Sequence, residues 1–176
     1  MKIIKRIFLL ILLGVALVLL VAVFLPRKYK VEHQININSS NEMVFKQISD
    51  LNNLRLWNAW PEMSSDSKQI ISETTNIEGA TWQWENLKTG NGNITITEAR
   101  EFTDVKARFE IQKPWALTAN AHWEITEKES HVELCYILEG KLSYPIERYK
   151  GLFMEQKIGK LFDKSLQELK QRCENE

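Results

Sequence analysis

The most uniform pattern in the chain is an apolar run near the N-terminus. From Ile7 to Leu25 no residue carries a charged, amide or hydroxyl side chain. At about 1.5 Å of rise per residue, a helix over this run is about 28 Å long, close to the roughly 30 Å hydrocarbon core of a bilayer. A single segment can cross lipid only as a helix, because only a helix satisfies its own backbone hydrogen bonds. The run therefore predicts one membrane-spanning helix over residues 7–25.

Basic residues flank this run on both sides. They are Lys2, Lys5 and Arg6 before it, and Arg27, Lys28 and Lys30 after it. Because the two groups balance, the Lys/Arg asymmetry says little about orientation, and the free amino terminus tips the count toward an internal N-terminus. We expect a single-pass membrane protein whose domain lies outside the cytoplasm.

A cleaved secretory signal is the alternative interpretation of the same run. Such signals have a shorter apolar region that ends in small residues of the A-x-A type. Here Ala22 is followed by the sequence VFLP. The pattern favours an uncleaved anchor with basic flanks over residues 1–28, followed by one domain over residues 29–176. A chain of that length can bury enough surface for one substantial core.

Strict alternation follows the anchor and predicts a strand with one buried face. Its apolar positions are Val31, His33, Ile35 and Ile37. Residues 39–42, SSNE, then fit a capping box, so a helix is expected to begin near Ser40. Asp50 can cap a second short helix that runs to about Trp57.

From Ile70 to Leu138 a two-residue period returns in successive segments. The expected inner faces are Ala80, Trp82 and Trp84; Ile94 and Ile96; Val105, Ala107, Phe109 and Ile111; Leu117, Ala119, Ala121, Trp123 and Ile125; and Val132, Leu134, Tyr136 and Leu138. Turn signals separate the segments, among them the sequence GNG at residues 90–92. Strands joined by short links form an antiparallel meander, because parallel neighbours require long crossovers.

The period changes to 3.6 residues near Pro145, a residue that suits the first turn of a helix. The apolar positions are Tyr149, Phe153, Ile158, Leu161, Phe162, Leu166 and Leu169. They predict one continuous helix of roughly 28 residues, about 42 Å long. Such a helix must lie across a sheet to bury its apolar stripe.

Three stretches carry a family resemblance. They are VEHQININSSNEMVFKQISDLNNLRLWNAW, GATWQWEN with GNGNITITEA, and LEGKLSYPIERYKGLFMEQKIGKLFDKSLQELK. Together with the order of elements they resemble the START-like superfamily, also called SRPBCC, in its polyketide cyclase/dehydrase and lipid-transport branch. The resemblance spans residues 29–172 and implies the α+β helix-grip fold. In that fold a curved antiparallel sheet wraps around a long C-terminal helix, with two short helices after the first strand.

The same resemblance implies an apolar cavity between sheet and helix that holds a lipid or another hydrophobic small molecule. An indole on a cavity wall offers apolar surface together with one N–H donor. The candidate lining residues are Trp57, Trp60, Trp82, Trp84, Phe109, Trp123, Tyr136, Phe153, Met154 and Ile158. Core packing, in which these side chains meet and leave no space, is the alternative for each of them.

No pattern for metal binding, cofactor binding or catalysis stands out. The sequence has no HxxxH, no closely paired cysteines and no carboxylate cluster with metal-ligand spacing. Cys135 and Cys173 are expected to be free thiols, with a bridge between them as the alternative. The formal net charge is +0, without the concentrated basic face that nucleic acid requires.

Three functions fit these observations. The favoured one is a membrane-anchored binding or carrier module, in which burial of apolar ligand surface supplies the affinity. The second is a cyclase or dehydratase acting on an apolar substrate, with His33, Tyr136, Glu98 and Tyr149 as the available acid–base groups. The third is an interaction or stress-response module with a closed core.

Overall fold

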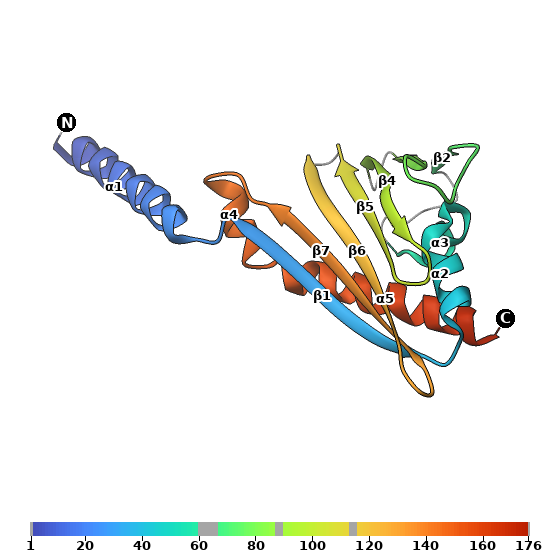
Figure 1. The fold of residues 1–176 in the computed structure, drawn as a ribbon. Coiled ribbons are helices and arrows are strands. Elements are labelled where there is room, and N and C mark those ends of the chain that lie inside the picture. The colour runs from blue at the N-terminus through green and yellow to red at the C-terminus, as the bar shows by residue number, and fades with distance from the viewer. Residues whose placement is uncertain (1, 60–66, 87–89, 113–115, 176) are drawn as a thin grey trace.

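The computed structural model describes residues 2–59, 67–86, 90–112 and 116–175, and its elements follow the predicted order (Figure 1). The elements are α1 (Lys2–Phe24), β1 (Lys28–Ile37), α2 (Asn41–Ser49), α3 (Leu51–Trp57), β2 (Lys68–Ile71), β3 (Thr81–Asn86), β4 (Gly90–Arg100), β5 (Asp104–Ile111), β6 (Leu117–Glu127), β7 (Val132–Lys141), α4 (Ile146–Gly151) and α5 (Met154–Asn175). Both capped helices are confirmed. The Ser40 hydroxyl accepts a hydrogen bond from the Met43 amide, and the Asp50 carboxylate accepts one from the Asn52 amide.

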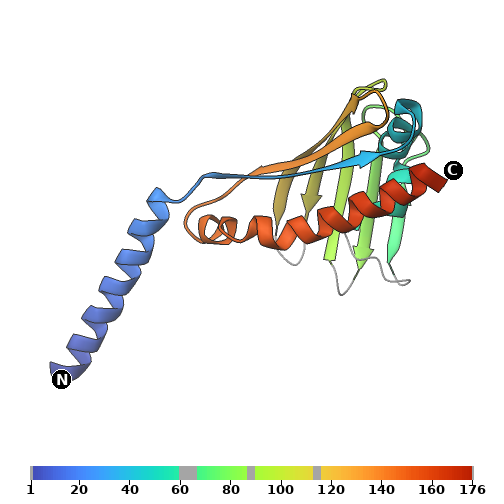
Figure 2. The same cartoon turned by 90° about the horizontal axis from the view of Figure 1, so that it is seen from below.

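The strands form one 7-stranded antiparallel sheet in the order β1-β7-β6-β5-β4-β3-β2. Links without a crossover join neighbouring strands from β2 to β7, as expected for a meander. Strand β1 lies at the edge of the sheet and pairs with β7. Helix α5 runs across the strands, and the α2–α3 pair lies beside its C-terminal end (Figure 2). One face of the curved sheet is therefore covered by helices.

The covered face carries the core. Along β5, β6 and β7 the buried apolar residues alternate with less buried ones, in the predicted parity. Antiparallel sheets with one packed and one solvated face produce this alternation. The opposite, outer face carries mostly charged and polar side chains such as Lys106, Asn120 and Glu139.

The prediction of a turn at residues 90–92 is wrong, because β4 begins at Gly90. Gly92 pairs with Trp84 on β3, and a Cβ built on Gly92 would lie 2.5 Å from Trp84 Cζ2. The missing side chain thus leaves space that the indole fills. Glycine in a strand often marks such a close approach.

The prediction of one continuous C-terminal helix is also wrong. The helix divides into α4 and α5, with Leu152 and Phe153 between them. Gly151 precedes the break, and a Cβ built there would lie 2.3 Å from Leu142 Cδ1. Glycine costs a helix about 1 kcal/mol relative to alanine, and here it allows the backbone to pack directly on Leu142. The residues after it bond by shorter i to i−3 links, from the Leu152 amide to Tyr149 and from the Phe153 amide to Lys150.

Helix α1 projects away from the rest of the chain (Figure 1). Its segment Ile3–Phe24 is long and apolar enough to cross a membrane, and 6% of its most apolar window is buried. A core helix hides most of its surface, whereas most apolar side chains of α1 are exposed and Ala22 near its end is buried. An anchor and a signal sequence share these properties.

Candidate functional site

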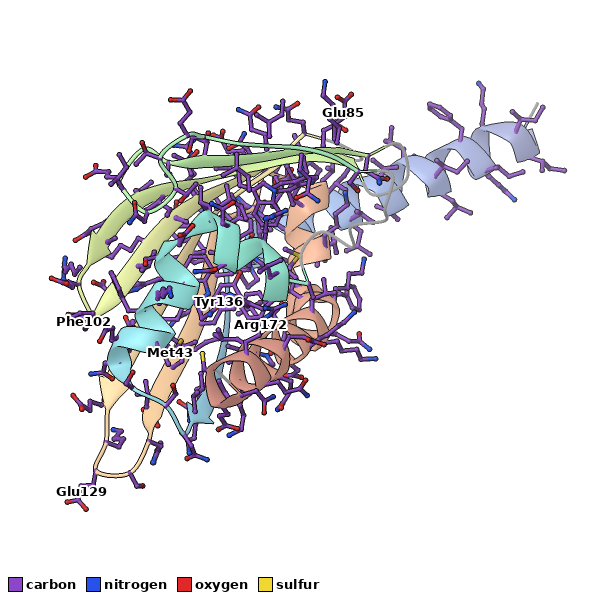
Figure 3. The ribbon with its side chains drawn as sticks, turned by 90° about the vertical axis from the view of Figure 1, so that its right-hand side faces the viewer. Met43, Glu85, Phe102, Glu129, Tyr136 and Arg172 are labelled. Atoms are coloured by element: carbon purple, nitrogen blue, oxygen red, sulfur yellow. The ribbon has the colours of Figure 1, made fainter. Side chains whose placement is uncertain are left out.

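A column of four aromatic rings links α5 to the sheet and to α3. Tyr136 on β7 stacks on Phe162 of α5 with ring centroids 3.8 Å apart and an angle of 6°. Trp123 on β6 also stacks on Tyr136, with ring centroids 4.8 Å apart. Trp57 of α3 meets Trp123 edge-on, with ring centroids 6.4 Å apart. All four side chains are buried, and Tyr136 lies in the interior of the domain (Figure 3).

The column fills the space between β7 and α5. Ring centroids at 3.8 Å are in van der Waals contact, so no ligand fits between Tyr136 and Phe162. Burial raises the pKa of the Tyr136 hydroxyl. This hydroxyl therefore stays neutral at physiological pH, and its ring acts as packing.

A second aromatic group extends from the column along β5 to β3. Trp82 and Trp84 lie 5.6 Å apart on β3, and Phe109 on β5 lies 6.5 Å from Trp123. Trp82 pairs with Ile94, and Ile94 pairs with Phe109, so Trp82 and Phe109 lie in one row across β3, β4 and β5. Trp123 on β6 pairs instead with Val105, four residues from Phe109 along β5. We call Trp82, Trp84, Phe109 and Trp123 the indole surface.

The indole surface contains two buried donors without acceptors. Within the described residues, Trp82 Nε1 and Trp123 Nε1 have no hydrogen-bond partner, although both side chains are 0% exposed. In contrast, Trp57 Nε1 donates to the Gln47 carbonyl at 3.0 Å. More than nine in ten buried polar groups find a partner, and leaving one unsatisfied costs about 1–3 kcal/mol. A bound water or ligand with an acceptor atom would satisfy these two N–H groups.

The predicted lining residues divide into three groups. Trp57, Trp82, Trp84, Phe109, Trp123, Tyr136 and Ile158 are buried, and Met154 packs partly buried against them. Phe153 lies in the break between α4 and α5 and is 55% exposed, so it is not part of the buried helical wall. Trp60 lies outside the described residues.

The proposed acid–base groups do not form one site. Glu98 lies on β4 and pairs with Arg100 and Lys106. Tyr149 donates to the Val18 carbonyl of α1 at 2.6 Å. His33 lies on β1 at the edge of α5, and Tyr136 is enclosed in the column. No group of three or more His, Cys, Asp or Glu side chains among the described residues could hold a metal ion.

His33 joins β1 to α5 through two carboxylates that the sequence did not reveal. Its Nδ1 lies 2.6 Å from Asp163 Oδ1 and its Nε2 lies 3.0 Å from Glu155 Oε1. Burial by itself lowers the pKa of His33, but the hydrogen bonds and charges of the two carboxylates outweigh it and raise the pKa above the usual value. Asp163 and Glu155 are more than 120 residues distant in sequence.

This arrangement predicts a pH-dependent stability. Because the folded chain raises the pKa of His33, protonated His33 stabilises the fold. This stabilisation is fully present below the unfolded pKa of about 6.5, and it is lost as the pH rises through the higher folded pKa. The carboxylates are 63% and 65% exposed, so solvent screening limits the effect to less than about 1 kcal/mol.

The measurement is chemical unfolding in detergent, followed by tryptophan fluorescence, for the wild-type chain and for His33→Gln. It is made at pH values below the unfolded pKa and above the folded pKa of His33. The wild-type chain should lose stability as the pH rises, relative to the variant. Parallel pH curves for the two chains would contradict the role given to His33.

Surface grooves on the outer face of the sheet contain charged and amide side chains. Two grooves of about 490 and 360 Å³ lie over β7, β6 and β5 and share Asn120 and Glu139. A third, of about 260 Å³, is lined by Gln83, Glu85 and Asn93 near the β2 edge. Lys106 and Glu139 place charges in the 360 Å³ groove, whereas small-molecule sites are mostly apolar with a few polar groups. The apolar surface with donors lies on the covered face.

Comparisons with known proteins show the fold. Neither protein-family descriptions nor curated protein sequences give a match. Among solved structures, the chain resembles protein CV1439 from Chromobacterium violaceum, with a TM-score of 0.61 and 10% identity over 82% of this chain and 96% of that one. The Aha1 dimer from Colwellia psychrerythraea gives a TM-score of 0.56 and 16% identity over 82% and 96%.

The di-domain ARO/CYC StfQ from the steffimycin biosynthetic pathway gives a TM-score of 0.62 and 10% identity over 84% of this chain and 51% of that one. At such low identities the match concerns architecture. The shared architecture is a curved antiparallel sheet with a long C-terminal helix. The chain has the α+β helix-grip fold.

Proposed function

We propose that the chain binds a hydrophobic small molecule or lipid against the indole surface, and that α1 anchors it in a membrane. The observation that carries the proposal is the pair of buried indole N–H groups, on Trp82 and Trp123, without acceptors among the described residues. Apolar ligand surface supplies the affinity, and the two donors orient a polar atom of the ligand. The similarity to StfQ, an ARO/CYC protein, supports a ligand of this class.

The ligand lies on the β3–β5 side of the aromatic column. Tyr136 and Phe162 are in direct contact, which excludes a ligand between them. In the strand order, Phe109 on β5 lies between Trp82 on β3 and Trp123 on β6, so a ligand that reaches both donors has to cover the Phe109 ring. The proposed site is thus smaller than the whole space between sheet and helix.

A cyclase or dehydratase activity at the same place has less support. General acid–base chemistry needs a titratable group within hydrogen-bond reach of the reacting atoms. The indole surface consists of three indoles and a phenyl ring. Binding is therefore the function that these residues support best.

The test removes each indole N–H donor and keeps a smaller aromatic ring at its position. In Trp82→Phe and Trp123→Phe, loss of one neutral hydrogen bond should weaken ligand binding about 3- to 10-fold. The probe is a fluorescent fatty acid titrated into the purified full chain in detergent. Tyr29→Phe is the control, because the buried Tyr29 hydroxyl also lacks a partner among the described residues but lies over Gly140 on β7.

The control should bind the probe within about twofold of the wild-type chain. Equal affinities for all three variants and the wild type would contradict the role of the two donors.

A further inference from the structure

The segment between β7 and α5 lies beside the end of α1. The Tyr144 hydroxyl donates to the Leu19 carbonyl at 2.9 Å, and the Tyr149 hydroxyl donates to the Val18 carbonyl at 2.6 Å. Arg148 donates to the carbonyls of Ala22 and Val23 at 3.0 and 3.3 Å. These bonds hold residues 144–149 against the helix, and Figure 1 shows α4 near the C-terminal end of α1.

Arg148 serves the end of α1 in two ways. The last four carbonyls of a helix have no intrahelical partner, and Ala22 and Val23 lie in that last turn. A cation there also interacts favourably with the helix dipole. The Arg148 guanidinium also lies 5.2 Å from the centre of the Tyr144 ring. The segment is thereby placed at a defined depth on α1.

That depth corresponds to a membrane interface. Val18 and Leu19 precede Phe24, the end of α1, by about 8 Å along the axis at 1.5 Å per residue. Interfacial helices bury their apolar side about 5–10 Å into the boundary between headgroups and acyl chains. Tyrosines and arginines concentrate at this boundary because they join an apolar body to a polar tip.

Residues 144–153 also expose apolar side chains beside α1. Ile146 is 67% exposed, and Leu152 and Phe153 are each 55% exposed. Ile146 and Tyr149 are three residues apart and share a face of α4, and Tyr149 bonds to α1. Arg27, Lys28 and Lys141 are exposed near the same end of the sheet, where they complement anionic headgroups.

We infer that residues 144–153 form a membrane-docking segment, which inserts Ile146, Leu152 and Phe153 into the lipid surface next to α1. The inference rests on the membrane anchoring proposed above and is independent of the ligand. Its consequence is orientation. The α4 end of α5 and the adjoining edge of the sheet then lie at the bilayer.

Depth measurement tests the inference. Ile146→Cys and Phe153→Cys are labelled with an environment-sensitive fluorophore in the full chain, in nanodiscs of phosphatidylcholine and phosphatidylglycerol. Ile77→Cys is the matched control, because Ile77 is 52% exposed but lies between β2 and β3, at the far edge of the sheet from β1. The wild-type chain gives the background.

That background should be low. Cys173 is buried, and burial together with the charge of Glu32 raises the pKa of Cys135 to about 11. A thiol reacts as the thiolate, so neither native cysteine should label rapidly near neutral pH.

Spin-labelled lipid should quench the labels at 146 and 153 by more than about twofold, at the depth of interfacial helices, while aqueous iodide should quench only the label at 77. Equal iodide quenching at all three positions would overturn the inference. Protection from both quenchers would also overturn it, because a protein or a second copy would then cover the segment.

Flotation of the chain with liposomes separates the two proposals. A chain that does not float lacks the anchor, and the docking inference fails with it. A chain that floats and docks but binds no hydrophobic probe leaves the docking inference intact and contradicts the ligand proposal.

Discussion

Phe162→Ala is expected to lower the free energy of unfolding by about 3–5 kcal/mol, the usual cost of removing a buried phenyl ring. Phe162 is 2% exposed and stacks on Tyr136, and its ring also meets His33 edge-on at 5.9 Å. The substitution therefore removes a ring of α5 that contacts both Tyr136 on β7 and His33 on β1. Unfolding by urea in detergent, followed by tryptophan fluorescence, measures the change.

Phe153→Ala is the matched control for this prediction. It removes the same ring from the turn before α5, where Phe153 is 55% exposed, and surface substitutions usually change stability by less than about 0.5 kcal/mol. A loss of similar size in both variants would mean that the aromatic column does not hold α5 on the sheet.

Gly92→Ala is expected to destabilise the chain by about 1–3 kcal/mol, although it adds only one methyl group. That methyl would lie 2.5 Å from Trp84 Cζ2 and 2.8 Å from the Glu110 carbonyl oxygen. The carbonyl belongs to the backbone of β5, so it cannot move without disturbing the pairing of β4 with β5. The indole must shift instead, and the indole surface loses its shape.

Gly14→Ala is the control, because nothing lies within 4 Å of a Cβ built on Gly14 in α1. Thermal unfolding of both variants, monitored by near-UV circular dichroism, should show a lower midpoint for Gly92→Ala alone. A midpoint for Gly92→Ala equal to that of the wild-type chain would contradict the close packing of Trp84 on β4.

The strands and caps could be predicted because their signals are local. The alternation in residues 105–111 reports directly which side chains face the core, and Ser40 and Asp50 lie at the caps where their side chains accept amide hydrogen bonds. Such patterns depend on neighbours within four residues. The helix-grip architecture was implied by the family resemblance of these elements, and the fold confirms it.

The errors arose where distant residues decide the local structure. From the sequence alone, Gly92 is typical of a turn, because the contact with Trp84 across the strand pair is not visible. Gly151 lies within a helical periodicity, and its contact with Leu142 is equally invisible in the sequence. Phe153 was assigned to the inner face for the same reason, since the predicted helix had no break there. The periodicity of apolar residues along one segment cannot show a contact with a residue of another element.

Much of the candidate site was equally hidden from the sequence. The position of Trp82, Phe109 and Trp123 on one face follows from strand parity, but the missing acceptors of the two indole N–H groups do not. The contact of Tyr136 with Phe162 joins residues from the sheet and the last helix. It restricts the proposed ligand to one side of the aromatic column, which no pattern along the chain could indicate.

Native mass spectrometry of the full chain, extracted in mild detergent, tests most directly whether the indole surface holds a hydrophobic ligand. We expect a fraction of the chain to carry a small hydrophobic molecule that organic solvent releases, and expect Trp82→Phe with Trp123→Phe to reduce that fraction. A uniformly empty chain that also takes up nothing from a panel of lipids would contradict the account.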